Sequence, residues 1–197
     1  RGAEKCLEVL CGMFPDADIF TLFHKEGVVS EAIESHKIFT SFFQRFPSIE
    51  NYYQNLLPLM PFAIEQFNFD GYDLVISSSW CCAKGVIVPF HVPHICYMYT
   101  PMRFSWDIKE MYADGSMLRK FLQQGLLHWI RMWEVAAAQR PDRVVSISNF
   151  VAKRVKKSFG IESDVVYPPV DVGMFLIGGD EVREDYYLMV TSFEPNK

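Results

Sequence analysis

YDLVIS (residues 72–77) and HICYMY (residues 94–99) are short apolar runs rich in β-branched and aromatic side chains. Runs of this kind, bounded by serine and proline, predict buried β-strands. Before and after these two runs, similar short runs alternate with longer stretches in which apolar residues recur at helical spacing. The expected elements are helix 3–13, strand 17–23, strands 72–77 and 94–99, helix 117–140, strand 143–147, helix 148–158 and strand 163–167. This alternation favours an α/β fold with a Rossmann-like, doubly wound and mostly parallel sheet.

The two ends of the chain and one internal segment depart from this alternation. Because the first expected element is a helix, we expect a strand of the same sheet before Arg1. Residues 38–69 are aromatic-rich and predict a loop followed by a helix that prolines interrupt. After the Pro168-Pro169 turn the composition changes. We therefore expect a domain over residues 1–172, a linker over 173–185, and the first strand and loop of a second domain over 186–197.

Charge and cysteine usage exclude several classes of function. The net charge is −5 and the isoelectric point is about 5.5, so the chain lacks the basic footprint of a nucleic-acid-binding protein. The five cysteines form no C-x-x-C pair and no zinc-spaced cluster, which favours reduced thiols in the cytoplasm and no metal site. His91 and His94 straddle Pro93 and are better explained as strand-end residues than as ligands. The charge-free stretch 51–64 contains two prolines and is too short to span a bilayer.

Ligands of an open α/β sheet gather at the carboxyl ends of its strands, so candidate site residues are sought there. Gly2, Ala3 and Glu4 open a helix, whose free N–H groups and dipole suit an anionic group such as a diphosphate. The alternative is an ordinary glycine at a helix start. Lys197 follows the expected strand 186–191 and could meet a phosphate, although a solvated terminal lysine explains it equally simply.

The segment after HICYMY, residues 99–107, offers a second group of candidates. Arg103 can fork onto phosphate or carboxylate oxygens, Asp107 can accept hydrogen bonds from sugar hydroxyls, and Trp106 offers a flat face on which a sugar ring can stack. The alternative is a surface loop in which Arg103 and Asp107 form an ion pair.

A series of motifs in a fixed order points to one family. The motifs are RGAEK, YDLVISSSWCCAKG, HICYMYTPMRFSWD, DRVVSISNFVAKRVKKSFG, DVVYPPVDVGMF and YYLMVTSFEPNK. In this order the chain resembles the N-terminal domain of family 4 retaining glycosyltransferases of the GT-B fold, in particular the mannosyltransferase-like members that assemble surface polysaccharides and lipopolysaccharide. The resemblance implies a two-domain enzyme with its cleft between Rossmann-like halves, of which the first binds the acceptor and the second the sugar nucleotide.

The resemblance also implies roles for particular residues. Gly2, Ala3 and Glu4 would border the donor diphosphate, and Lys197 would be a phosphate-binding lysine. Acceptor and transferred sugar would lie against four residues of the second segment, which are Thr100, Arg103, Trp106 and Asp107. Tyr99 stands where the family often has histidine and is the candidate catalytic position.

Three departures from the family pattern are visible. Ser192 replaces an arginine that contacts phosphate in many relatives, and Arg1 stands where a glycine is common. The family's paired glutamates, eight residues apart, belong to the second domain. Glu26 and Glu34 show the same spacing here, but we interpret that as chance.

The function implied by the resemblance is transfer of a hexosyl group, mannosyl in particular, from a nucleotide sugar such as GDP-mannose to a saccharide or lipid-linked acceptor. No further cofactor, metal or nucleic acid is expected, and the chain alone should be inactive. The aromatic residues of 39–69 beside Arg45 suggest peripheral contact with the inner face of a membrane. Equally, those aromatics could pack under the sheet as core.

Two other functional classes remain open at the level of sequence. One is a non-catalytic nucleotide- or sugar-binding Rossmann module. The other is half of a nicotinamide-dependent oxidoreductase, which is disfavoured because no G-x-G-x-x-G follows a strand.

Overall fold

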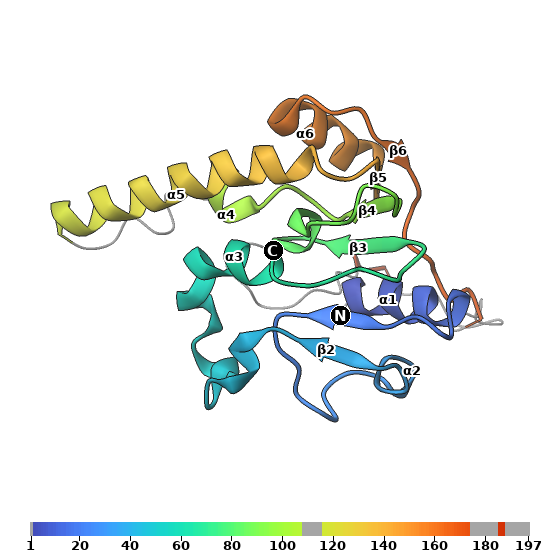
Figure 1. The fold of residues 1–197 in the computed structure, drawn as a ribbon. Coiled ribbons are helices and arrows are strands. Elements are labelled where there is room, and N and C mark those ends of the chain that lie inside the picture. Colours follow the sequence, from blue (N-terminus) through green and yellow to red (C-terminus); the bar gives the residue numbers. More distant parts are fainter. Residues whose placement is uncertain (1, 108–115, 174–184, 188–197) are drawn as a thin grey trace.

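The computed structural model describes residues 2–107, 116–173 and 185–187 (Figure 1). Its strands are β1 (Ile19–Thr21), β2 (Ile38–Thr40), β3 (Val75–Ser79), β4 (His94–Met98), β5 (Arg143–Ser146) and β6 (Asp164–Val165). They form a two-stranded sheet, β1-β2, and a four-stranded sheet in the order β3-β4-β5-β6. Every strand pair of the described residues is parallel. The predicted α/β architecture with parallel strands is confirmed.

Helices connect these strands. They are α1 (Gly2–Met13), α2 (Glu31–Glu34), α3 (Met60–Ile64), α4 (Arg103–Trp106), α5 (Met117–Ala138) and α6 (Asn149–Phe159). Short 3-10 helices lie at Phe42–Arg45, Ile49–Asn51, Tyr53–Leu59 and Ala83–Gly85. As the sequence predicts, the Ser148 hydroxyl caps α6 by accepting the Val151 N–H at 3.2 Å.

Helices cover both faces of the four-stranded sheet, and neighbouring residues at the end of β4 show this directly. Met98 is fully buried and packs in a cluster with Val151 and Val155 of α6. Tyr99, the next residue, directs its side chain to the opposite face, where its hydroxyl reaches Ala3 of α1. Successive side chains of an extended chain alternate between faces, so α1 and α6 belong to different layers.

Residues 38–69 hold more structure than the sequence predicts. Ile38 to Thr40 form β2, which pairs in register with Ile19 to Thr21. Pro58 lies inside a 3-10 helix, and Pro61 stands in the first turn of α3, where its missing N–H costs nothing. The expected loop and interrupted helix are therefore replaced by a short strand and several short helical turns.

Other boundaries shift at element ends. The expected strands 17–23 and 163–167 shorten to Ile19–Thr21 and Asp164–Val165. Of the expected strand 186–191, residues 188–191 lie outside the described residues, as does most of the expected linker 173–185. All five cysteines are free and buried.

Candidate functional site

Tyr99 joins three chain segments at the carboxyl end of the four-stranded sheet. Its hydroxyl donates to the Ala3 carbonyl oxygen in the first turn of α1 at 3.2 Å. The same oxygen lies 3.0 Å from the Ser78 hydroxyl, on the neighbouring strand β3. Two candidates from distant parts of the sequence, the start of α1 and Tyr99, are therefore in direct contact.

The environment of Tyr99 keeps its phenol neutral. Partial burial raises the pKa of Tyr99 above its ordinary value, and the nearby Cys6 thiol raises it further, while the hydrogen bond with Ser78 acts in the opposite direction. A phenol in this state can donate or accept a hydrogen bond but does not act as a base near neutral pH. Tyr99 is thus chemically suited to orienting a polar ligand or the backbone of α1.

The first turn of α1 offers backbone N–H groups to this edge of the sheet. Gly2 begins the helix, and a Cβ built at Gly2 would meet no other atom within 4 Å, so the space beside it is open. Ala3 and Glu4 line a cavity that also includes Ser78. An anion placed here would meet the positive end of the helix dipole.

The segment after Tyr99 forms a short wall that ends in α4. Pro101 and Met102 are almost completely buried, whereas Arg103 is exposed. The Thr100 hydroxyl donates to the Pro101 carbonyl oxygen at 3.0 Å. Arg103 makes no ion pair with any other residue that the structure describes.

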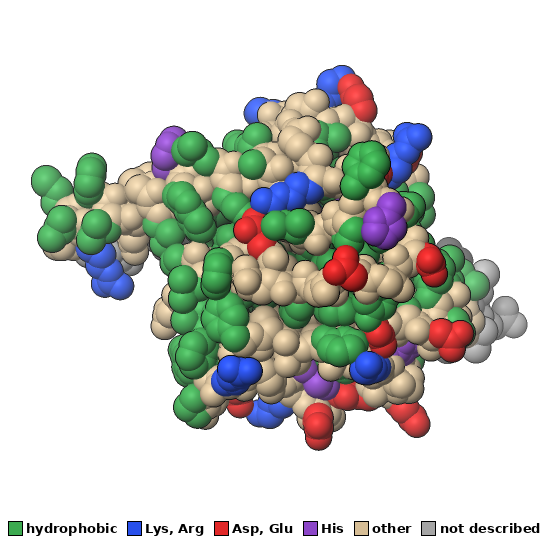
Figure 2. Space-filling view, in the orientation of Figure 1, with side chains coloured by type: hydrophobic (Ala, Val, Ile, Leu, Met, Phe, Trp, Pro, Cys, Tyr) green, Lys and Arg blue, Asp and Glu red, His purple; other side chains and the backbone are tan. Residues whose placement is uncertain are grey.

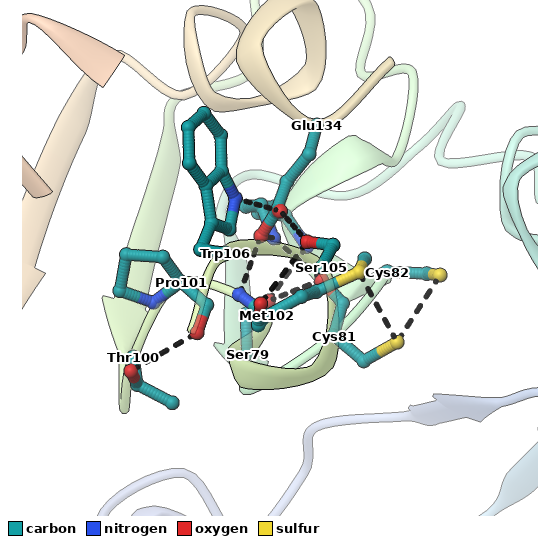
Figure 3. Close-up of polar contacts among 10 residues, drawn as sticks. Ser79, Cys81, Cys82, Thr100, Pro101, Met102, Ser105, Trp106 and Glu134 are labelled. Atoms are coloured by element: carbon teal, nitrogen blue, oxygen red, sulfur yellow. Dashed lines mark hydrogen bonds and ion pairs between the residues drawn. The ribbon is translucent and has the colours of Figure 1, made fainter. Parts of the chain in front are cut away.

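A fully buried carboxylate holds this wall in place (Figure 3). Oε1 of Glu134, on α5, accepts the backbone N–H of Met102 at 2.9 Å. Oε2 of the same residue accepts the indole N–H of Trp106 at 2.7 Å. The two ends of the segment 102–106, which contains α4, are thereby both held by one side chain of α5.

The counter-ion of Glu134 is Lys84, from the loop that follows β3. The Nζ of Lys84 lies 2.9 Å from Oε1 of Glu134 and donates to the Cys81 carbonyl oxygen at 2.6 Å. Neither charged side chain is accessible to solvent. A buried charge pair needs such additional hydrogen bonds to offset desolvation, and here the same bonds position the loops after β3 and β4.

Trp106 and Asp107 are held by protein partners. Trp106 is half-buried and lies edge-on to Phe159. It packs against two clusters of buried apolar residues, one that includes Met102 and one that includes Met98. Asp107 pairs with Arg154 of α6 and not with Arg103, so the alternative of an Arg103–Asp107 pair is wrong. Helix α4 ends at Trp106, just before Asp107, and α6 presents Arg154 to that carboxylate.

The structure thus brings Gly2, Ala3, Glu4 and Tyr99 to one edge, with the chain running directly from Tyr99 into Thr100 and α4. Lys197 lies outside the described residues. Sequence reasoning missed Lys84, Glu134 and Ser78. Lys84 and Glu134 each stand alone as a charge in an apolar run, CCAKGV and WEVAAA, and that isolation was the available indication.

His94 is a structural residue at the start of β4. Burial lowers the pKa of His94 to about 4, against a smaller opposing effect of Asp142. Its Nε2 lies 2.9 Å from the Ser77 hydroxyl. Within the described ranges, no group of three or more His, Cys, Asp or Glu residues is arranged to hold a metal ion.

Comparison with known proteins connects this geometry to a family. The model of the family described as Glycosyltransferase Family 4 matches residues 2–173. The search of curated proteins and the search of solved structures gave no match. None of the helices in the described part of the chain has the length and apolarity needed to cross a bilayer. Since the family model covers most of the chain, including both sides of the Tyr99 contact, the chain belongs to glycosyltransferase family 4.

Proposed function

We propose that this chain is the acceptor-side half of a retaining glycosyltransferase. The enzyme would move a hexosyl group, mannosyl in particular, from a nucleotide sugar such as GDP-mannose to a lipid-linked saccharide during surface-polysaccharide synthesis. Family membership supports sugar transfer in general. The identity of the donor, the identity of the acceptor and the stereochemistry of transfer go beyond family membership and belong to our proposal.

One observation carries the proposal: the Tyr99 hydroxyl contacts the Ala3 carbonyl in the first turn of α1. The contact supports the proposal because it brings the N-terminus of α1, which we propose binds the donor diphosphate, next to the segment that we propose meets the acceptor. Transfer needs a stabilised diphosphate leaving group next to an oriented hydroxyl, and these two features supply one of each.

The chain's own residues have separable tasks in this proposal. The N–H groups at Gly2 and Ala3 stabilise charge that develops on the departing diphosphate. Thr100 and the exposed Arg103 bind acceptor or transferred sugar through hydroxyl and guanidinium hydrogen bonds. Glu134 touches neither substrate and acts as a positioning residue, because it fixes Met102 and Trp106 on either side of Arg103.

In the reaction, the bond between the anomeric carbon and the diphosphate oxygen breaks while the acceptor oxygen bonds to the same carbon. The acceptor hydroxyl proton passes to the departing diphosphate, so the proposal requires no protein base at Tyr99. This fits the raised pKa of Tyr99, which keeps it protonated.

A lipid-linked acceptor requires access to a membrane surface, and the first half of α5 is the best-suited surface. Figure 2 shows apolar side chains gathered on its protruding end. Met117, Leu118, Phe121 and Leu122 are each more than 60% exposed there. Residues 116–133 contain Arg119, Lys120 and Arg131 but no acidic residue, a composition suited to anionic lipid.

The aromatic segment expected to make this contact contributes less. Phe43 is fully buried in the core, and Phe42 and Tyr53 are half-buried against it. Only Phe46 and Phe62 are substantially exposed among its phenylalanines from 42 to 62. We therefore assign peripheral membrane contact to the protruding end of α5.

The proposal is tested with the gene product that carries this chain. Purified protein is incubated with a panel of GDP- and UDP-sugars and an extract of lipid-linked saccharides, and nucleoside diphosphate release is measured. We expect release with GDP-mannose that depends on the acceptor, and an axial anomeric linkage by NMR of the product. An inverted linkage would overturn the retaining mechanism, and folded protein that binds a nucleotide sugar but releases nothing would favour a non-catalytic module.

A further inference from the structure

Three sulfur atoms lie in contact beside the loop that follows β3 (Figure 3). The Cys81 Sγ is 3.5 Å from the Cys82 Sγ and 3.9 Å from the Met102 Sδ. Cys81 and Cys82 are neighbours in the chain, whereas Met102 belongs to the segment after β4. All three side chains are buried. The sulfurs therefore join the loops that follow two adjacent strands of the sheet.

The backbone turns both thiols to the same side. Adjacent residues of an extended chain direct their side chains to opposite faces, which would separate the two sulfurs. Cys82 instead has φ −85° and ψ −18°, in the right-handed helical region, at the cap of the 3-10 helix Ala83–Gly85. The Cys81 carbonyl oxygen accepts from the Lys84 Nζ at 2.6 Å and from the Ser79 hydroxyl at 3.3 Å. Hydrogen bonds within the loop thus hold the conformation that brings the two thiols together.

The two thiols differ in how readily they ionise. The hydrogen bond with Cys82 lowers the pKa of Cys81, and the nearby Lys84 ammonium lowers it further, whereas burial and Glu134 act in the opposite direction. The same hydrogen bond raises the pKa of Cys82, and burial raises it further. Cys81 therefore loses its proton more readily than an ordinary cysteine, while Cys82 retains its own. The thiolate is the form of cysteine that binds a metal ion.

Sulfur ligands of these two kinds suit a soft ion of low charge. Thiolate and thioether sulfurs together favour Cu(I), whereas structural Zn²⁺ takes four ligands, one more than these sulfurs provide. A first-row metal bonded to sulfur at about 2.3 Å holds the sulfurs of a trigonal site about 4 Å apart. The two separations of 3.5 Å and 3.9 Å are close to that value.

A cavity of about 1060 Å³ gives access to the thiols. Cys81 and Cys82 both line it, and Phe104 of α4 lines it on the side of the Met102 segment. Cys81 keeps 9% of its surface exposed. A small ion that enters the cavity can therefore reach the sulfurs without unfolding of the loop.

We propose that Cys81, Cys82 and Met102 form a binding site for one Cu(I) ion, with two thiolates and one thioether as ligands. Binding breaks both S–H bonds, forms two copper–thiolate bonds and one copper–thioether bond, and releases two protons to solvent with no change of oxidation state. The Lys84 ammonium, bonded to the Cys81 carbonyl, offsets part of the negative charge of the bound thiolates. The inference is independent of the transfer reaction.

The test uses Cu(I) itself as the probe. The gene product that carries this chain is reduced, kept free of oxygen and titrated with Cu(I) that a chromogenic chelator buffers, so that the colour of the chelator reports the affinity. We expect Cys81→Ser and Cys82→Ser to weaken binding by about a hundredfold. Met102→Leu, which conserves side-chain volume, should weaken it by about tenfold.

A matched control and a count of ligands complete this experiment. Cys11→Ser should leave the affinity unchanged, although Cys11 is also buried and lines the same cavity. X-ray absorption at the copper edge should show three sulfur ligands in the native chain and two in Met102→Leu. The Tm of every variant is first measured without the ion, and only variants that are folded are compared.

Phenylarsine oxide tests the pair of thiols separately from the thioether. Its arsenic forms one As–S bond with each thiol, and its oxygen leaves as water with the two thiol protons. Mass spectrometry in an excess of a monothiol counts the arsenicals that remain bound. The native chain and Met102→Leu should each retain one more than Cys81→Ser or Cys82→Ser.

Three results would overturn the proposal. The first is a Cu(I) affinity that Cys81→Ser and Cys82→Ser leave unchanged, because the ion would then be adventitious and held by other thiols. The second is Met102→Leu with unchanged affinity and an unchanged number of sulfur ligands. The third is a folded native chain that retains no arsenical at Cys81 and Cys82, since the sulfurs would then only fill space in the core.

Discussion

The Nζ of Lys84 lies 2.9 Å from the Glu134 carboxylate, and neither side chain is accessible to solvent. The pair links the loop after β3 to the long helix α5, and Glu134 also receives the Met102 N–H. Two charges withdrawn from water are tolerated together and costly apart. The stability of the fold and the shape of the proposed acceptor wall therefore depend on the same interaction.

Lys84→Met should lower the free energy of unfolding by about 3–5 kcal/mol, because it leaves the Glu134 carboxylate buried without a counter-ion. Urea denaturation measures the loss. Adding Glu134→Gln to this variant should restore part of it, since the uncompensated charge is removed while an acceptor oxygen remains. Losses that simply add would show that the two residues do not interact. Lys5→Ala, which breaks an exposed pair with Glu8, is the control and should change nothing measurable.

Gly85→Ala should destabilise the chain by about 1–3 kcal/mol through overpacking. A Cβ at Gly85 would lie 2.7 Å from Cη2 of the Trp133 indole and 3.2 Å from Cβ of Ala137. Thermal unfolding measures the effect, and a second change, Trp133→Leu, should relieve it. The matched control is Gly125→Ala inside α5, where a Cβ meets nothing within 4 Å and helix propensity should raise stability slightly.

Stability should fall between pH 6.5 and pH 4 because of His94. Its pKa is lowered to about 4 in the folded chain by burial, whereas an unfolded histidine titrates near 6.5. The unfolded chain therefore binds a proton first as pH falls. The contribution is complete above about pH 6.5 and declines toward pH 4, by about 3 kcal/mol in total.

The measurement is urea unfolding at several pH values for the native chain and for His94→Gln. The free energy of unfolding of His94→Gln should fall less between pH 6.5 and pH 4 than that of the native chain. The difference between the two curves reports the contribution of His94, including its interaction with Asp142. An NMR titration of His94 in the folded chain that gave an ordinary pKa near 6.5 would contradict the prediction.

Tyr99→Phe should lower kcat/KM of the complete enzyme by about tenfold and leave Tm nearly unchanged, because one hydroxyl is lost from a half-buried position. Tyr99→His should retain more activity than Tyr99→Phe, since an imidazole can still donate toward Ala3. The control is Tyr97→Phe, two residues earlier, whose hydroxyl donates to the Val166 carbonyl at 3.0 Å. Equal losses in Tyr97→Phe and Tyr99→Phe would argue against a role specific to the α1 contact.

Leu118→Ser combined with Phe121→Ser should weaken binding to vesicles that contain phosphatidylglycerol by at least about tenfold, since apolar area at the end of α5 is lost. Sedimentation with vesicles measures the partition. Phe90→Ser is the control, because Phe90 is fully exposed before β4 and not on α5. Binding that the double variant leaves intact would remove the membrane assignment from this surface.

The sequence predicts the elements that are locally determined. YDLVIS and HICYMY become β3 and β4 because each is a short apolar run between polar or proline boundaries. Helix α5 follows from a long apolar stripe, and the start of α6 follows from the capping Ser148. The proximity of the first turn of α1 to Tyr99 could also be predicted, because in a parallel sheet the loops that follow the strands all lie at the same, carboxyl edge.

What the sequence does not predict depends on contacts between distant residues. The run Ile38 to Thr40 is too short to predict a strand from the sequence alone. Its strand character becomes evident only from its pairing with β1. Asp107 finds Arg154 rather than Arg103, because that choice depends on how α6 packs. Lys84 and Glu134 are fifty positions apart, and only the tertiary fold shows that two isolated charges neutralise each other.

The Glu134 network also sets an order of events during folding. The Met102 N–H and the Trp106 indole depend on a carboxylate that lies about thirty residues further along the chain. Until α5 has formed and docked, these two donors lack their acceptor and the Lys84 ammonium lacks its counter-ion, so water competes for all three groups. We therefore expect the proposed acceptor wall to become ordered only together with the docking of α5, and not as a local loop, because both of its anchoring bonds end on Glu134.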